Sequence, residues 1–176
     1  MEVPAGDTGK TMQDWIGGYY DHMFSVNPMW APDFKTFPKH PITNGVKPFK
    51  VVDEWYFNMR FRQDGVGKIT PILAAKPGKD VRDGPYVYPK GPYKHILDAQ
   101  GRPETTMWAY ERPNGSRGFG FTGGHKHVNW GNDNYRKVVL NGLLWLAKAD
   151  IPKNGADSKV TAEELKQHLD PKGRRK

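Results

Sequence analysis

The sequence predicts a mixed α/β domain, and three segments carry this prediction. Apolar residues at every second position across 55–61 indicate a strand with one apolar face. Two further extended segments, 105–111 and 118–122, flank the turn residues at 113–115 and predict a hairpin. A run of mostly apolar residues within 132–149 predicts a largely buried helix, of the kind that packs on a sheet.

A shorter helix is predicted near the amino terminus. Apolar side chains at i, i+3, i+4 and i+7 would form one helical face, made of Met12, Trp15, Ile16 and Tyr19. The pair Gly17–Gly18 is expected to cut this helix short, because glycine loses more conformational entropy than other residues when it is fixed in a helix.

Three features of the remaining chain complete the expected fold. Residues 69–75 predict a strand in which Pro71 indicates an end or an edge of the sheet, because proline cannot donate to a neighbouring strand. Residues 76–102 are rich in Gly, Pro and Tyr and predict a long loop, of a length that often serves a binding site. One of Asn132, Asp133 and Asn134 is expected to cap the long helix.

Composition limits the class of protein. The 176 residues suit one domain, and 27 Lys+Arg against 19 Asp+Glu give a net charge of +8. Six Trp, eight Tyr and eight Phe supply core material, which excludes disorder for the body of the chain. The absence of cysteine excludes disulfides and a cysteine nucleophile within these residues, and leaves the compartment undetermined. We find no apolar run long enough to span a membrane and no signal peptide in this chain.

The predicted division is a domain over 1–150 and a basic tail over 151–176. Thr161 and Glu164 have the spacing of a capping box and predict a short helix in the tail. The run 166–176 carries five basic groups and no aromatic residue, so a solvated extension is favoured over a nucleic-acid surface. Neither a nucleic acid nor a membrane is expected as a partner.

The densest polar cluster spans 122–131, between a short strand and the long helix. The pair Gly123–Gly124 permits close backbone approach to a ligand, and its N–H groups could hold a developing oxyanion. His125 and His127 are candidates for acid/base or binding roles, although loop histidines also serve simply to bond backbone carbonyls. Asn129 and Trp130 add an amide and an aromatic ring to the same cluster.

A second cluster lies at the start of the predicted strand. Adjacent carboxylates at Asp53 and Glu54 point to opposite faces of an extended backbone, so they do not form a sugar-cleaving pair by themselves. One of them could orient a histidine or bond sugar hydroxyls, while the other has a structural role. Tyr56 follows on the same strand as a binding candidate.

Several common chemistries are not indicated. The sequence has no Gly-x-Ser-x-Gly nucleophile elbow, no phosphate loop and no dinucleotide fingerprint. His125, His127 and a carboxylate could bind zinc, but their spacing is generic, so we assign no metal. The cofactor is undetermined.

Five segments in order resemble the ThuA-like (trehalose utilisation) family. They are His-Pro-Ile-Thr-Asn-Gly at 40–45, Asp-Glu-Trp-Tyr at 53–56, Trp108, Gly-Phe-Gly-Phe-Thr-Gly-Gly-His at 118–125, and Leu-Trp at 144–145. This family belongs to the class I glutamine amidotransferase-like superfamily. The resemblance therefore implies a flavodoxin-like, three-layer α/β fold.

The chain departs from the family pattern in two respects. It resembles the C-terminal portion of the domain, so the N-terminal βα units are expected to be missing, the sheet incomplete and the isolated chain marginally stable. Amidotransferases carry a glutamate two residues after their catalytic histidine, whereas His127 follows His125 here. Glutamine hydrolysis is therefore not expected. A homo-oligomer or a separate N-terminal half would supply the missing contacts.

The resemblance implies carbohydrate utilisation, with trehalose in the name-giving member. The expected enzyme uses His125 as general acid/base, oriented by Asp53 or Glu54, on a small carbohydrate. The expected binding residues are Tyr56, Gly123, Gly124, His127, Asn129 and Trp130. The alternatives are a non-catalytic sugar-binding or interaction module and, more remotely, a metal-dependent hydrolase. Whether the chain is an enzyme stays open at this point.

Overall fold

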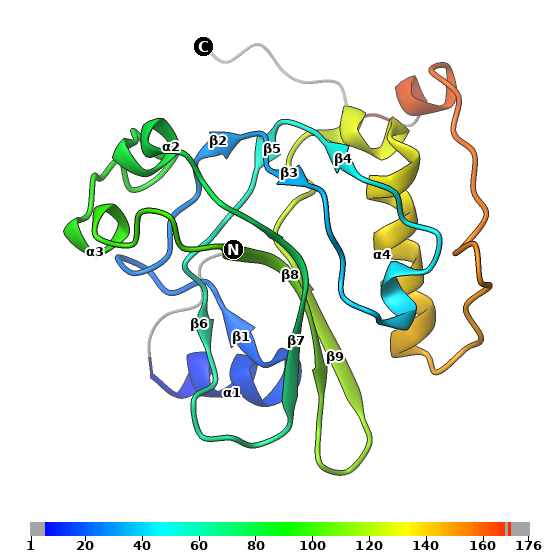
Figure 1. Ribbon diagram of the computed structural model, residues 1–176, viewed down its shortest axis with the longest axis horizontal. Helices are drawn as coiled ribbons and strands as arrows, with labels where there is room; N and C mark the ends of the chain where they lie inside the picture. The colour runs from blue at the N-terminus through cyan, green and yellow to red at the C-terminus, as the bar shows by residue number, and fades with distance from the viewer. Residues whose placement is uncertain (1–5, 168, 170–176) are drawn as a thin grey trace.

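The largest sheet of the molecule has three antiparallel strands. A computed structural model describes residues 6–167 and 169. In it the strand order is β7 (Lys68–Ala75), β8 (Glu104–Glu111) and β9 (Arg117–Phe121), as Figure 1 shows. A turn joins β8 to β9, in which the N–H of Gly115 donates to the carbonyl of Arg112 (2.9 Å). The predicted hairpin is therefore confirmed, and helices packed on the sheet make the chain a mixed α/β protein.

The proline in β7 lies at the edge of this sheet, as predicted. Pro71 is opposite Trp108 of β8, and the register shifts between Pro71 and Leu73. Within the described residues β7 pairs with β8 alone, so the missing N–H of Pro71 costs no hydrogen bond to a second neighbour.

Three two-stranded ladders lie around the main sheet. They join β1 (Gly18–Tyr19) to β6 (Arg60–Phe61), β2 (Met29–Trp30) to β5 (Asp53–Glu54), and β3 (Asp33–Phe34) to β4 (Phe49–Lys50). Every strand pairing in the described part of the chain is antiparallel. These ladders hold the segment 18–61 as a series of short extended pieces.

The prediction of one continuous strand over 55–61 is wrong. Trp55 and Phe57 are fully buried, as the alternation requires, but Asn58 has a positive φ of 55°. Its side chain donates to the carbonyl of Phe24 (2.7 Å), which stabilises this turn of the backbone. The alternation therefore reports burial, whereas the strand pairing of residues 55–61 is limited to β6 and a single bridge between Phe57 and Val26.

The long helix α4 (Asp133–Leu146) begins at its predicted cap. The Asn132 side chain accepts from the N–H groups of Asn134 and Tyr135. The helix is largely buried, as expected, with six buried and five half-buried residues, but Leu143 and Leu146 are 50% and 40% exposed. One face of α4 packs on the sheet, and the sheet does not reach the face that carries Leu143 and Leu146. Neither α4 nor any other helix within residues 6–167 is long and apolar enough to cross a membrane.

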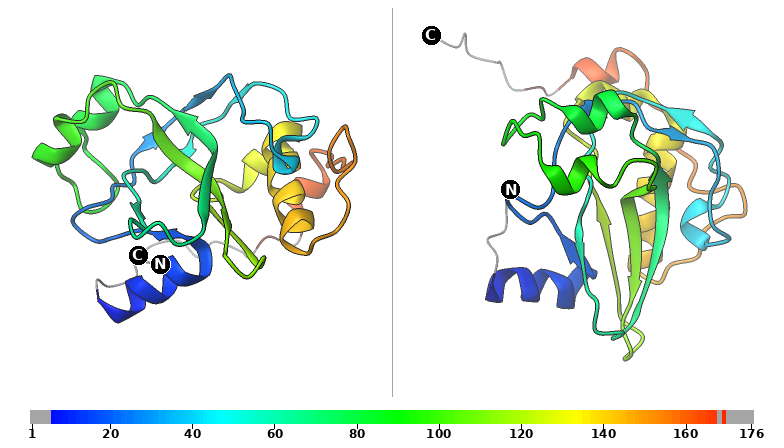
Figure 2. Two further views of the ribbon diagram at one scale, coloured as in Figure 1. Left: turned by 60° about the horizontal axis from the view of Figure 1, so that its bottom comes forward. Right: turned by 60° about the vertical axis from the view of Figure 1, so that its left-hand side comes forward.

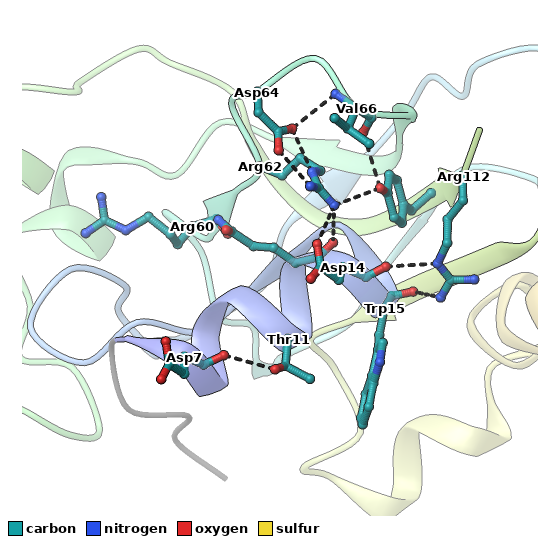
Figure 3. A network of polar contacts seen from close by, with 11 residues as sticks. Asp7, Thr11, Asp14, Trp15, Arg60, Arg62, Asp64, Val66 and Arg112 are labelled. Atoms are coloured by element: carbon teal, nitrogen blue, oxygen red, sulfur yellow. Dashed lines mark hydrogen bonds and ion pairs between the residues drawn. The ribbon is translucent and has the colours of Figure 1, made fainter. Parts of the chain in front are cut away.

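The first helix, α1 (Asp7–Ile16), ends at Gly17, as predicted, where the backbone turns left-handed (φ 82°). Tyr19 lies in β1 rather than on the helix, which corrects the expected apolar stripe. Figure 3 shows how two arginines hold the end of α1: Arg62 donates to the Asp14 carboxylate (2.8 Å), and Arg112 donates to the carbonyls of Asp14 and Trp15. Cations at a helix C-terminus are favourable because the last carbonyls are unpaired.

Helices α1 and α4 lie on opposite faces of the sheet (Figure 2). A Cβ on Gly118 of β9 would lie 2.3 Å from the carbonyl oxygen of Trp15 in α1. On the other face, Gly142 of α4 lies against Met107 and Phe119. Successive residues of β9 therefore contact different helices: Gly118 faces α1 and Phe119 faces α4. The lack of a side chain at Gly118 lets α1 pack closely on this face.

The predicted long loop at 76–102 contains two short helices, α2 (Lys79–Asp83) and α3 (Lys94–Leu97). Arg82 of α2 is fully buried and pairs with Glu104 at 2.8 Å. The same arginine donates to the carbonyls of Ile96 and Arg102. The segment is thus folded around one buried guanidinium, although its sequence is typical of a loop.

The segment that follows α4 returns along that helix (Figure 1). The N–H of Ala156 donates to Asn141 (2.8 Å), and Arg136 bonds the hydroxyl of Ser158 (2.8 Å). The predicted capping box precedes η3 (Glu164–Lys166): the Thr161 N–H donates to the Glu164 carboxylate, and the Glu164 N–H donates to the Thr161 hydroxyl. Most of the basic run 166–176 lies outside the described residues.

Candidate active site

The two adjacent carboxylates of β5 serve different parts of the molecule. Asp53 and Glu54 are 0% and 4% exposed, and extended backbone directs their side chains apart. Asp53 contacts the backbone of the loop at 122–127 and the start of α4, whereas Glu54 lines a pocket and reaches His125. Of the two predicted possibilities for a carboxylate here, a contact with a histidine or with sugar hydroxyls, the structure contains the first, between Glu54 and His125.

Asp53 organises the glycine-rich loop. One carboxylate oxygen accepts from the N–H of Gly124 (3.0 Å) and the hydroxyl of Tyr135 (2.7 Å), and the other accepts from the N–H groups of Glu54 and Lys126. Burial alone would raise the pKa of Asp53, but these hydrogen bonds outweigh burial and lower it. The same burial, together with the bond to Asp53, raises the pKa of the Tyr135 hydroxyl. Asp53 is therefore an ionised structural acceptor.

Glu54 holds the imidazole of His125. Its carboxylate oxygen Oε2 lies 2.7 Å from His125 Nδ1, and Oε1 accepts from the side-chain amide of Asn27 at 2.8 Å. The Glu54 side chain is 5% exposed, whereas that of His125 is 60% exposed. A buried carboxylate thus fixes the orientation of a largely exposed ring. It engages Nδ1, so the direction of the other ring nitrogen, Nε2, is set as well.

This pair opens into a pocket of about 310 Å³. The pocket lies between α1, β1 and the sheet and is rich in aromatic rings and thioethers. Its lining consists of Met12, Ile16, Gly18, Tyr19, Tyr20, Glu54, Tyr56, Met59, Trp108, Gly120, Phe121, Thr122, Gly123 and His125. The Trp108 indole is fixed there because its N–H donates to the carbonyl of Ile16 (2.6 Å).

The composition of the lining defines the chemistry that the pocket can support. It includes no Lys or Arg, so it offers no cation to a phosphate or carboxylate. The Thr122 hydroxyl donates to the carbonyl of Tyr56 (3.0 Å) and is therefore not directed at a ligand. Among the described residues there is no group of three His, Cys, Asp or Glu that could hold a metal ion. The histidine and carboxylate in this lining are groups that can carry out acid/base chemistry.

Several predicted site residues lie elsewhere. His127, Asn129 and Trp130 belong to the turn of η2 (His127–Gly131) and do not line the pocket, which corrects their predicted binding role. Asn129 donates to the carbonyl of Val52 (2.9 Å), and Trp130 packs edge-on against Tyr135. The side chains of Asn129 and Trp130 fasten the loop to its neighbours, whereas His127 is exposed.

Two further predictions need correction for the same reason. The N–H of Gly124 is already donated to Asp53, so it is not a donor for an oxyanion in the pocket. Asp53 uses both oxygens within the protein, so it does not act on a ligand directly. Tyr56 and Gly123 do line the pocket, together with Glu54 and His125.

Sequence reasoning missed Asn27, Tyr20 and Trp108 as pocket or supporting residues. Asn27 is 8% exposed, and its amide bonds Glu54 from a segment with no regular pattern. Tyr20 packs edge-on against Tyr56, with ring centroids 5.3 Å apart. No motif marks Asn27 or Tyr20, whereas Trp108 sits in a predicted strand opposite Gly120, a pairing that the hairpin register would have revealed.

We expect Asn27→Ala to weaken both the fold and the pocket. It removes the amide that bonds Glu54 and leaves a buried carboxylate oxygen without this donor, so the free energy of unfolding should fall by about 1–3 kcal/mol. Urea denaturation measures the loss. The control is Gln63→Ala on the surface, where a change within about 0.5 kcal/mol is expected. Equal losses in the two variants would contradict a supporting role for Asn27.

The fold and the pocket define the class of protein, a mixed α/β domain with a carboxylate–imidazole pair beside an aromatic pocket. The sequence profile of the ThuA family, described as trehalose utilisation, matches residues 5–146. The chain therefore belongs to the ThuA family. Searches of curated proteins and of solved structures give no match.

Proposed function

We propose that this domain binds a neutral sugar in the pocket and acts on it by acid/base catalysis. The observation that carries the proposal is the Glu54–His125 pair, 2.7 Å apart, at a pocket lined by aromatic rings and lacking Lys and Arg. Sugars present apolar C–H faces and many hydroxyls, so rings and a polar pair are suited to them. The family description of trehalose utilisation supports the same class of ligand.

We assign a role to each member of the pair from its contacts. Because Nδ1 of His125 is engaged by the Glu54 carboxylate, Nε2 is the ring nitrogen that remains for a ligand. Nε2 takes a proton from a sugar hydroxyl, or returns one, while Glu54 stabilises the imidazolium. Asn27 keeps Glu54 in position from the side opposite the histidine.

Replacement of His125 by Ala tests the proposal. Incubation with trehalose or its oxidised derivatives, followed by chromatography of the products, should show turnover in the natural protein and a loss of at least about 100-fold in the variant. Glu54→Gln should have a similar effect, since it keeps the shape but not the charge. His127→Ala is the matched control, because this exposed histidine does not line the pocket. Unchanged turnover in His125→Ala would refute the mechanism.

A non-catalytic sugar-binding module is the second candidate. The observation in its favour is that the lining holds no Ser, Cys or Lys and that its one threonine hydroxyl bonds a backbone carbonyl. Titration with trehalose, followed by the intrinsic tryptophan fluorescence to which Trp108 in the pocket wall contributes, would reveal binding. Binding without any product over a range of candidate sugars would favour this module over the enzyme.

We also propose that the fold is related to the flavodoxin-like class of the amidotransferase superfamily. Helices α1 and α4 on opposite faces of one sheet support a three-layer arrangement. The antiparallel pairing of β7, β8 and β9 would then be the outer part of such a sheet.

A further inference from the structure

The segment between α2 and α3 is fastened to the candidate active site. The side-chain oxygen of Asn27 accepts from the N–H of Tyr88 (2.9 Å), while the amide nitrogen of the same residue donates to Glu54 (2.8 Å). The carbonyl of Asn27 also accepts from the N–H of Val87 (3.3 Å). One asparagine therefore separates the backbone of Tyr88 from the carboxylate that holds His125.

A second bond joins the same segment to the pocket wall. The hydroxyl of Tyr20, which lines the pocket, donates to the carbonyl of Tyr88 (3.3 Å). Tyr88 is thus held through both its backbone groups by residues that belong to the site. Next to it, Tyr86 is 1% exposed and anchors the segment in the core.

Tyr88 as a residue is 58% exposed despite this firm attachment. It stacks on His22, with centroids 6.0 Å apart and planes 21° apart. His22 itself follows the pocket residues Tyr19 and Tyr20 by two or three positions. An aromatic residue that stays largely exposed and is fixed in position offers apolar ring surface to the C–H face of a sugar.

We propose that Tyr88 and His22 form an outer subsite that receives the second ring of a disaccharide whose first ring occupies the pocket. The inference rests on the proposed function, since it extends the same sugar site. The pocket, of about 310 Å³, lies at the lower end of small-molecule sites, and neither Tyr88 nor His22 lines it, so a ring that contacts them lies outside the pocket. The subsite makes the domain selective for two-ring neutral sugars over single rings.

The test compares a one-ring and a two-ring ligand. Calorimetric titration of the full chain with glucose and with trehalose is expected to show tighter binding of trehalose. Tyr88→Ala should weaken trehalose binding about two- to ten-fold and leave glucose binding unchanged. Tyr88→Phe keeps the ring and should bind like the natural protein. Leu143→Ala, at a similarly exposed position on α4, should alter neither affinity.

The outcomes separate this inference from the function on which it rests. Equal affinities of Tyr88→Ala and the natural protein for trehalose, or an equal loss for both sugars, would overturn the subsite. If His125→Ala and Glu54→Gln still weakened the binding of both sugars, the proposed function would stand. Binding of neither sugar by the natural protein would overturn both proposals. Thermal melts of each variant confirm that the comparison is made on folded protein.

Discussion

Asp53→Ala is expected to lower the free energy of unfolding by about 3–5 kcal/mol, because it leaves several donors without their hydrogen-bond acceptor at once. The carboxylate is fully buried and accepts four hydrogen bonds, three from backbone N–H groups and one from Tyr135. No single neighbour can replace it, since the donors come from β5, the loop at 122–127 and α4. Urea denaturation, monitored by circular dichroism, measures the change.

The matched control is Tyr135→Phe, which removes one of these bonds and keeps the ring that packs against Trp55. Its expected loss is about 1 kcal/mol. Asp53→Ala should also weaken ligand binding, because the loop that Asp53 holds carries His125 into the pocket. A loss below that of Tyr135→Phe would show that the four bonds contribute little.

Because its pKa is lowered in the folded protein, Asp53 makes the free energy of unfolding depend on pH in acid. The folded protein releases this proton more readily than the unfolded chain, so the contribution of Asp53 is complete above its ordinary pKa near 3.8. That contribution is lost as the pH falls through the folded value. The stability difference between the natural protein and Asp53→Asn should therefore be constant from neutral pH down to about 5 and shrink below about 4. A difference that grew in acid would contradict this assignment.

Local signals made the elements of the fold predictable. The β8–β9 hairpin follows from turn residues between two extended runs, and Asn132 caps α4 because its side chain reaches two backbone N–H groups. The exposure of Leu143 on α4 was not predictable from the helix itself. It depends on how much sheet the described chain places against that face, which is a tertiary property.

The sequence could name candidate side chains of the site by their chemistry, and their roles stay predictions. Glu54 and His125 were both candidates, and the structure brings them to 2.7 Å. Which of two adjacent carboxylates faces the pocket depends on the direction of the extended backbone, and nothing local to Asp53 or Glu54 decides it. The sequence alone also overvalued Asn129 and Trp130, because a short helical turn directs them toward backbone and core rather than toward a ligand.

The segment at 76–102 illustrates a different limit. Its glycines and prolines are typical of a loop, yet Arg82 is fully buried, and no sequence rule marks one arginine among many as internal. The partner, Glu104, begins β8 and also accepts from Arg102 and from the N–H of Asn58. This carboxylate thus joins the segment that carries Tyr88 to the sheet.

Glu104→Ala is accordingly expected to cost about 3–5 kcal/mol, since it leaves the buried Arg82 guanidinium without its counter-charge. The control is Asp98→Ala on the same segment, where the Lys94–Asp98 pair is exposed and worth about 0–1 kcal/mol. Urea denaturation of both variants measures the contrast. Because Arg82 holds the segment through the carbonyls of Ile96 and Arg102, protease cleavage within 84–93 should also accelerate in Glu104→Ala alone. Similar stabilities and cleavage rates in the two variants would show that the buried pair does not hold this segment in place.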